Sequence, residues 1–141
     1  GPITYTEEED LFAKGIQEAT GKKQVGIDAA ITPLKPTEKN PGGGSTDVGD
    51  VSYVVPTVRL VVATAPKDTP WHSWAVVACS GMSIGHKGMI YAAKTLAMTM
   101  VDLFEDEKLR DDIKSEFLER KGDYVYKGIV PDGPPPIDYT D

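Results

Sequence analysis

A short apolar segment flanked by prolines constrains the fold of this chain more than any other feature. Residues 58–65 read VRLVVATA, lie between Pro56 and Pro66, and are rich in β-branched side chains. A short apolar run bounded by turn residues is typical of a strand that is buried on both faces. We therefore expect residues 58–65 to form the central strand of an α/β domain, in which a short mixed sheet is packed by two or three helices.

The first expected helix covers residues 7–20. Thr6 and Glu9 have the spacing of a capping box, in which each side chain bonds the backbone N–H of the other residue. Apolar residues then recur at helical spacing, and Gly21 is a natural carboxyl-terminal stop. We expect a short amphipathic helix.

The main expected helix covers about residues 86–105 and opens at Ser83 or His86. Its apolar stripe consists of Met89, Ala92, Ala93, Leu96, Ala97, Met100, Val101 and Phe104. A stripe this wide favours packing against a sheet, so a charge introduced at Leu96 should be buried, unpaired and strongly destabilising. A second helix, dense in charge on its outer face, should follow Asp106 and end at Gly122.

Composition excludes several classes of function. The 141 residues suffice for one domain, and the net charge of −7 argues against binding to nucleic acid or to anionic membrane surfaces. No apolar run reaches the roughly 20 residues of a membrane helix, and no signal peptide is visible at the start. The single cysteine, Cys79, lies in an apolar run that suits the core and fits a reducing compartment. We expect a cytoplasmic protein.

The start of the sequence leads us to expect a piece of a longer protein. The chain begins Gly1-Pro2, without an initiator methionine. Residues 124–141 are rich in proline, which favours an extended tail without a core of its own.

His72 follows the expected strand, where open α/β sheets hold their ligands. It stands between Trp71 and Trp74. His72 could be a metal ligand, a general base or a structural residue. The two tryptophans favour a site, because an aromatic surrounding would strengthen electrostatic interactions at a metal. His86, at the start of a helix, is expected to pack or cap.

A glycine turn with acidic residues precedes the expected strand. Residues 42–47 read GGGSTD, and Asp50 follows. Asp47 and Asp50 could bind a metal, orient its ligands, or simply form turns. A phosphate-binding loop is not expected, because the lysine of that motif is missing. Ser73 lacks the surroundings of a nucleophile elbow.

Three blocks of sequence together resemble a known family. They are GGSTDVGDVSYVVPT, TPWHSW and SIGHKGMIYAAKTLA. In this order and spacing they resemble the carboxyl-terminal part of the aminobenzoyl-glutamate utilization protein B group, which are amidohydrolases of the di-metal aminoacylase/carboxypeptidase superfamily. The resemblance covers nearly the whole chain. It implies that residues 1–141 are a carboxyl-terminal segment of a metallopeptidase-type catalytic domain.

The resemblance also implies a reaction and a site. The reaction would be hydrolysis of an amide bond to an amino acid, with p-aminobenzoyl-glutamate as the type substrate and two divalent ions, zinc or manganese, per full-length subunit. His72 matches the family's last histidine ligand. Ser45, Thr46 and Asp47 match a turn beside the active site and are expected to contact the substrate. The other ligands and the glutamate base lie upstream in the family, so we expect no catalytic residue here, weak metal binding and no activity from this chain alone.

A different class of function stays open. The chain could be a non-catalytic module that binds a partner or a small ligand on the same scaffold, and upstream ligand residues would distinguish the two. In either case an incomplete sheet should leave an exposed edge or apolar surface. We therefore expect self-association into a homo-oligomer or association with a related subunit.

Overall fold

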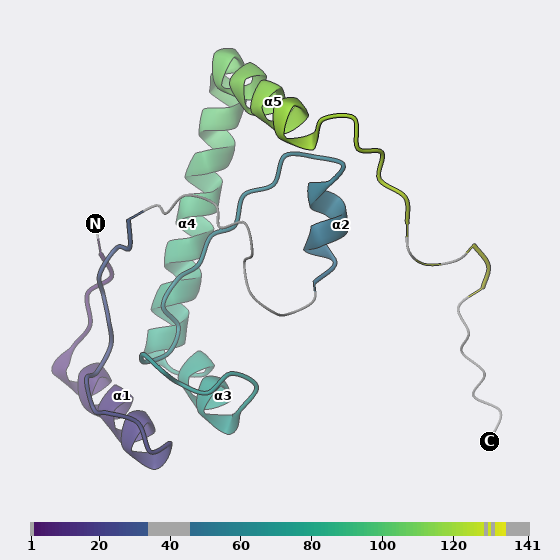
Figure 1. Cartoon of the computed structure of the whole chain (residues 1–141). Helices are drawn as coiled ribbons and strands as arrows, with labels where there is room; N and C mark the ends of the chain where they lie inside the picture. Colours follow the sequence, from purple (N-terminus) through teal and green to yellow (C-terminus); the bar gives the residue numbers. More distant parts are fainter. Residues whose placement is uncertain (1, 34–45, 129, 131, 135–141) are drawn as a thin grey trace. The chain divides into compact units, whose positions relative to one another are not determined.

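The computed structural model of this chain describes residues 2–33, 46–128, 130 and 132–134. Its helices, shown in Figure 1, are α1 (Glu7–Ala19), α2 (Val48–Ser52), α3 (Trp74–Ser80), α4 (Ser83–Glu105) and α5 (Glu107–Lys121). The chain divides into two compact units, and each is described by itself. Unit 1 (Gly1–Lys39 and Arg59–Asp106) contains α1, α3 and α4, whereas unit 2 (Asn40–Val58 and Glu107–Asp141) contains α2 and α5.

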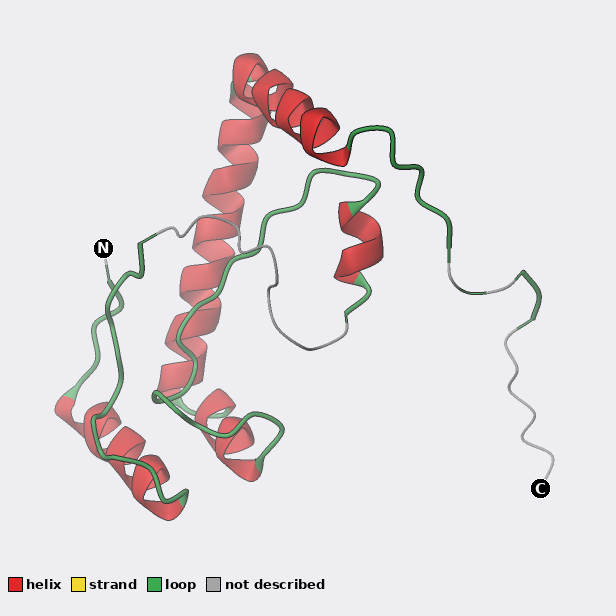
Figure 2. Ribbon diagram, viewed as in Figure 1, coloured by secondary structure: helices red, strands yellow, loops and turns green. Residues whose placement is uncertain are grey.

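The predicted α/β fold with a mixed sheet is wrong. The described residues contain helices but no strand, and the expected central strand, residues 58–65, is loop (Figure 2). A strand exists only through backbone hydrogen bonds to a neighbour, and no described segment pairs with this one. Its first half is exposed: Val58 retains 79% and Val61 71% of its accessible surface. The apolar character of the run was identified correctly, but its pairing was not.

Helix α1 confirms the first predicted helix. The Thr6 hydroxyl accepts a hydrogen bond from the Glu9 N–H at 3.2 Å, and the Glu9 carboxylate accepts one from the Thr6 N–H at 2.7 Å. Gly21 ends the helix with a φ of 68°, a left-handed conformation that glycine adopts without strain. The capping box and the stop therefore lie where the sequence predicted them.

Helix α4 confirms the main predicted helix but not its packing. It begins at Ser83, and its buried residues are Ile84, Gly85 and Gly88, all within its first two turns. The predicted stripe faces solvent within this chain, since Met89, Leu96 and Met100 retain 58%, 48% and 56% of their accessible surface. The expectation that Leu96 is buried against a sheet is therefore wrong as well.

The small core of unit 1 lies between α1 and α3. Ile16 of α1 packs with Ala75 and Cys79 of α3, and Phe12, Ala65 and Ala78 cover this cluster. Cys79 is fully buried, as predicted, and burial raises the pKa of its thiol. Helices α3 and α4 also pack against each other.

A buried amide ties three segments of unit 1 together. The Gln17 side chain is fully buried. Its Oε1 accepts hydrogen bonds from the N–H groups of Val25 and Gly26, both at 2.9 Å. Its Nε2 donates to the carbonyls of Gly26 at 3.3 Å and Lys67 at 3.2 Å. Helix α1 is thereby joined to the chain that follows it and to the loop after residue 65.

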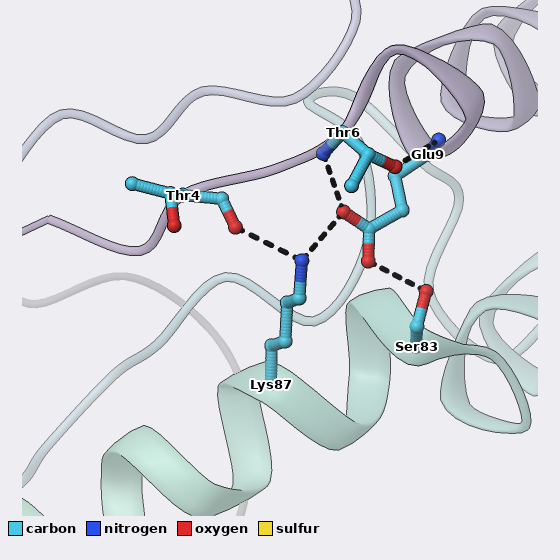
Figure 3. Close-up of polar contacts among 5 residues, drawn as sticks. All are labelled: Thr4, Thr6, Glu9, Ser83 and Lys87. Atoms are coloured by element: carbon cyan, nitrogen blue, oxygen red, sulfur yellow. Dashed lines mark hydrogen bonds and ion pairs between the residues drawn. The ribbon is translucent and has the colours of Figure 1, made fainter.

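A partly buried ion pair fixes the start of α1 against the start of α4 (Figure 3). The Glu9 carboxylate accepts hydrogen bonds from the Lys87 ammonium at 2.7 Å and from the Ser83 hydroxyl at 2.6 Å. The Lys87 ammonium also donates to the Thr4 carbonyl at 3.0 Å. The Glu9 side chain is 8% exposed, and these bonds, led by those from Lys87 and Ser83, lower the pKa of its carboxyl to about 2.

Unit 2 contains a helix that the sequence did not predict and one that it did. Helix α5 confirms the charged helix expected after Asp106, and Gly122 follows its last residue. The short α2 lies in the segment expected to be a turn. The ring of Tyr53, next to α2, packs against Tyr124 and Tyr126, with centroids 4.9 Å and 6.0 Å away. None of the helices in the described part of the chain combines the length and the apolar character of a membrane span.

Two glycines test the helix packing in unit 1. A Cβ at Gly88 would lie 2.5 Å from the Ala63 carbonyl oxygen, whereas a Cβ at Gly15 meets nothing within 4 Å. Gly88→Ala should lower the free energy of unfolding by about 1–3 kcal/mol because backbone must move. Gly15→Ala should raise it by up to about 1 kcal/mol, through helix propensity alone. Denaturant unfolding measures both, and equal effects of the two substitutions would contradict the contact between α4 and residues 63–64.

The Glu9 ion pair predicts an acid-sensitive stability. Its carboxyl pKa is lowered from 4.5 to about 2 in the folded state, so the pair stabilises the fold fully above about pH 4.5. This contribution should be lost as the pH falls from about 4.5 through about 2, because folding then requires a proton to be released. Glu9→Gln should lower the melting temperature at pH 7 and flatten its dependence on pH over this window. The exposed neighbour substitution Glu8→Gln should do neither.

Candidate functional site

The candidate site is built on residues 66–73, here called the His72 loop, which connect the segment 58–65 to α3. A turn opens the loop: the Thr69 hydroxyl donates a hydrogen bond to the Pro66 carbonyl at 2.7 Å. A second turn closes it, where the Ser73 hydroxyl donates to the Pro70 carbonyl at 2.6 Å. Pro66 and Thr69 are buried, and the Lys67 carbonyl is held by Gln17. The loop is therefore fixed at both turns and from α1.

His72 has a strained backbone within this fixed loop. Its φ is 58°, and Asp68 has a φ of 62°. Residues other than glycine rarely adopt this left-handed region, although histidine and aspartate do so more often than most. Such a conformation costs on the order of 1–3 kcal/mol and persists only where the surroundings impose it. The second turn and the start of α3 flank His72 and impose its position.

The imidazole of His72 is exposed, and so are both neighbouring indoles. Trp71 retains 74% and Trp74 58% of its accessible surface. Within this chain the two tryptophans therefore do not enclose His72. His86 lies in the first turn of α4 and is exposed as well. Ser73 lies at the amino end of α3, and its hydroxyl donates a hydrogen bond to the Pro70 carbonyl.

The acidic turn belongs to unit 2, whereas His72 belongs to unit 1. Asp47 precedes α2, is exposed, and makes no capping hydrogen bond with its side chain. The Thr46 hydroxyl accepts a hydrogen bond from the Val48 N–H at 3.3 Å. The Asp50 carboxylate accepts a hydrogen bond from Tyr126 and so raises the pKa of that phenol. Ser45 lies outside the described residues.

The candidate ligands do not form a complete metal site in the described ranges. In residues 2–33, 46–128, 130 and 132–134, no three His, Cys, Asp or Glu side chains are grouped so that they could hold a metal ion. His72, exposed and presented on a fixed loop, fits the position of a single ligand. It does not by itself provide a metal centre.

A pocket beside the His72 loop was not predicted from the sequence. It has a volume of about 610 Å³ and is formed within unit 1 by residues 62–66, part of the His72 loop, α3 and the segment after α1. Its lining includes Lys22, Asp68, Thr69 and Trp71. No sequence motif predicts that Lys22 lies near the His72 loop. The two are brought together by the hydrogen bond from the Gln17 side chain to the Lys67 carbonyl.

Comparison with known proteins finds a clear relative among curated sequences. The chain is 37% identical over 101 residues to a subunit of p-aminobenzoyl-glutamate hydrolase from Escherichia coli (strain K12). The alignment covers 72% of this chain and 21% of the relative, so the chain spans about a fifth of that protein's length. No family model matches the chain. No solved structure matches it.

The alignment extends over 101 residues, which is far more than the three short blocks contain together. The resemblance inferred from the blocks around Asp47, His72 and His86 is therefore confirmed: this chain is related to part of a p-aminobenzoyl-glutamate hydrolase subunit.

Proposed function

We propose that the intact protein is a metal-dependent amidohydrolase that cleaves the amide bond of p-aminobenzoyl-glutamate-type substrates, and that His72 is one of its metal ligands. The observation that carries this proposal is the 37% identity to a p-aminobenzoyl-glutamate hydrolase subunit. The strained backbone of His72 supports it, because strain in a fixed loop often accompanies a functional site.

The chain's own part in this reaction is to hold and orient. A bound divalent metal would lower the pKa of a water molecule and polarise the amide carbonyl. His72 would contribute one imidazole nitrogen to that metal, from a loop that Gln17 and the two turns keep in place. The turn of Ser45, Thr46 and Asp47 would contact the substrate. We assign no general base to this chain, and we propose that it is inactive by itself.

An assembly is part of the same proposal. The relative is named as one subunit of its hydrolase, which supports association of this protein with another subunit or with a second copy of itself. Exposed apolar side chains on α4, such as Met89, Leu96 and Met100, provide surface for such contacts.

Substitution of His72 in the full-length protein tests the proposed ligand. His72→Ala should remove one metal equivalent per subunit and most of the hydrolysis of p-aminobenzoyl-glutamate, because an imidazole ligand is lost. His86→Ala, which removes the other histidine of this chain, should change neither. Metal content is measured by elemental analysis, and hydrolysis by release of p-aminobenzoate.

Substitution by glycine separates a ligand role from a folding role. Glycine adopts a φ of 58° without strain, so His72→Gly should leave the protein at least as stable as the wild type. It should nevertheless lose metal and turnover as His72→Ala does. Retention of both metal and turnover in His72→Gly and His72→Ala would contradict the assignment of His72 as a ligand. A wild-type full-length protein that binds no metal and hydrolyses no amide would instead favour the non-catalytic binding module.

A further inference from the structure

The pocket beside the His72 loop combines a flat aromatic surface with one charge of each sign. Trp71 provides the indole, Lys22 a cation and Asp68 a carboxylate, and all three line the same pocket. Its volume of about 610 Å³ is within the range of small-molecule sites. Residues 62–66 also belong to its lining. Such a lining suits a flat ligand that carries a hydrogen-bond donor and an anionic group.

The pocket is lined in part by the same loop that carries His72. Trp71 immediately precedes His72, and Asp68 lies in the same loop, whereas His72 itself does not line the pocket. Lys22 comes from outside the loop, and its backbone N–H donates to the Gln17 carbonyl at 2.7 Å. The Gln17 side chain also holds the Lys67 carbonyl, so one residue sets the positions of both Lys22 and the loop. A ligand in this pocket would contact the residue that immediately precedes His72 in the sequence.

We propose that this pocket is the specificity subsite for the substrate, an inference that rests on the proposed function. The indole of Trp71 stacks on the aminobenzoyl ring, the Asp68 carboxylate accepts a hydrogen bond from the aromatic amine, and the Lys22 ammonium pairs with a glutamate carboxylate. The ring, the aromatic amine and one of the two glutamate carboxylates are then each matched by one side chain. The scissile amide, which joins the ring to the glutamate, then lies between the contacts from Trp71 and Lys22.

Two charge-removing substitutions in the full-length protein test the assignment through selectivity. Lys22→Gln should weaken binding of p-aminobenzoyl-glutamate about five- to tenfold, which is the effect expected for losing one charge-assisted contact. Asp68→Asn should weaken binding of p-aminobenzoyl-glutamate by a similar factor but should leave benzoyl-glutamate, which lacks the amine, unchanged. Asparagine tolerates the left-handed backbone of position 68, so the loop should keep its shape. Binding is measured by equilibrium dialysis on metal-stripped protein, in which hydrolysis does not interfere.

A neighbouring lysine provides the matched control. Lys23 is exposed and does not line the pocket, so Lys23→Gln changes the net charge by the same amount without removing a contact. If Lys22→Gln and Lys23→Gln weakened the binding of p-aminobenzoyl-glutamate equally, the effect would come from long-range electrostatics, and the proposal would be overturned. Unchanged affinity in both Lys22→Gln and Asp68→Asn would also overturn it, as would no measurable binding of p-aminobenzoyl-glutamate to the wild type.

The same measurements distinguish a failure of the subsite from a failure of the proposed function. A wild-type protein that hydrolyses p-aminobenzoyl-glutamate while both pocket variants keep its affinity has the proposed activity but a different subsite. A protein that binds p-aminobenzoyl-glutamate with the expected selectivity but hydrolyses no amide has the subsite without the activity.

Discussion

The arrangement of unit 1 depends on the buried amide of Gln17. A glutamine amide offers two donors and one carbonyl oxygen, and burying it without partners would cost several kcal/mol. Here it bonds the backbone of Val25, Gly26 and Lys67, so α1, the segment that directly follows it and a loop fifty residues from Gln17 share one anchor. An apolar side chain in its place would leave the N–H groups of Val25 and Gly26 without these partners. The His72 loop owes its attachment to α1 to this residue.

The Glu9 ion pair acts at the other end of α1 in a comparable way. Glu9 completes the capping box of α1 and also accepts bonds from Ser83 and Lys87 of α4. With a pKa of about 2 its carboxyl stays ionised at neutral pH, which suits a structural contact and not a general acid or base. Polar contacts thus fix both ends of α1, while the buried apolar core between α1 and α3 remains small.

Helix α4 carries both buried and exposed apolar residues. Ile84, Gly85 and Gly88 are buried within unit 1, whereas Met89, Leu96 and Met100 face solvent in this chain. A helix that is apolar around most of its circumference is typical of one that is covered on more than one side. This distribution is in keeping with the proposed assembly, in which another subunit or a second copy of the protein would cover the exposed side.

The sequence by itself determined the helices that depend on local interactions. The Thr6–Glu9 capping box and Gly21 bound α1, and Gly122 follows α5, because caps and stops act within a few residues. It also indicated the relative, since three blocks in a fixed order are a property of the sequence. His72 was singled out in the same way, from its neighbours and its place after an apolar run.

Only the tertiary structure decided how the apolar run 58–65 is used and what surrounds His72. Whether an extended segment is a strand depends on a partner that local sequence does not specify, and in the described residues this one has none. Gln17 has the sequence context of an ordinary polar residue on a surface helix, and Lys22 that of a solvated lysine. Their roles depend on the hydrogen bond between Gln17 and Lys67, which are fifty residues apart in the sequence. No periodicity or capping motif predicts a contact of this kind.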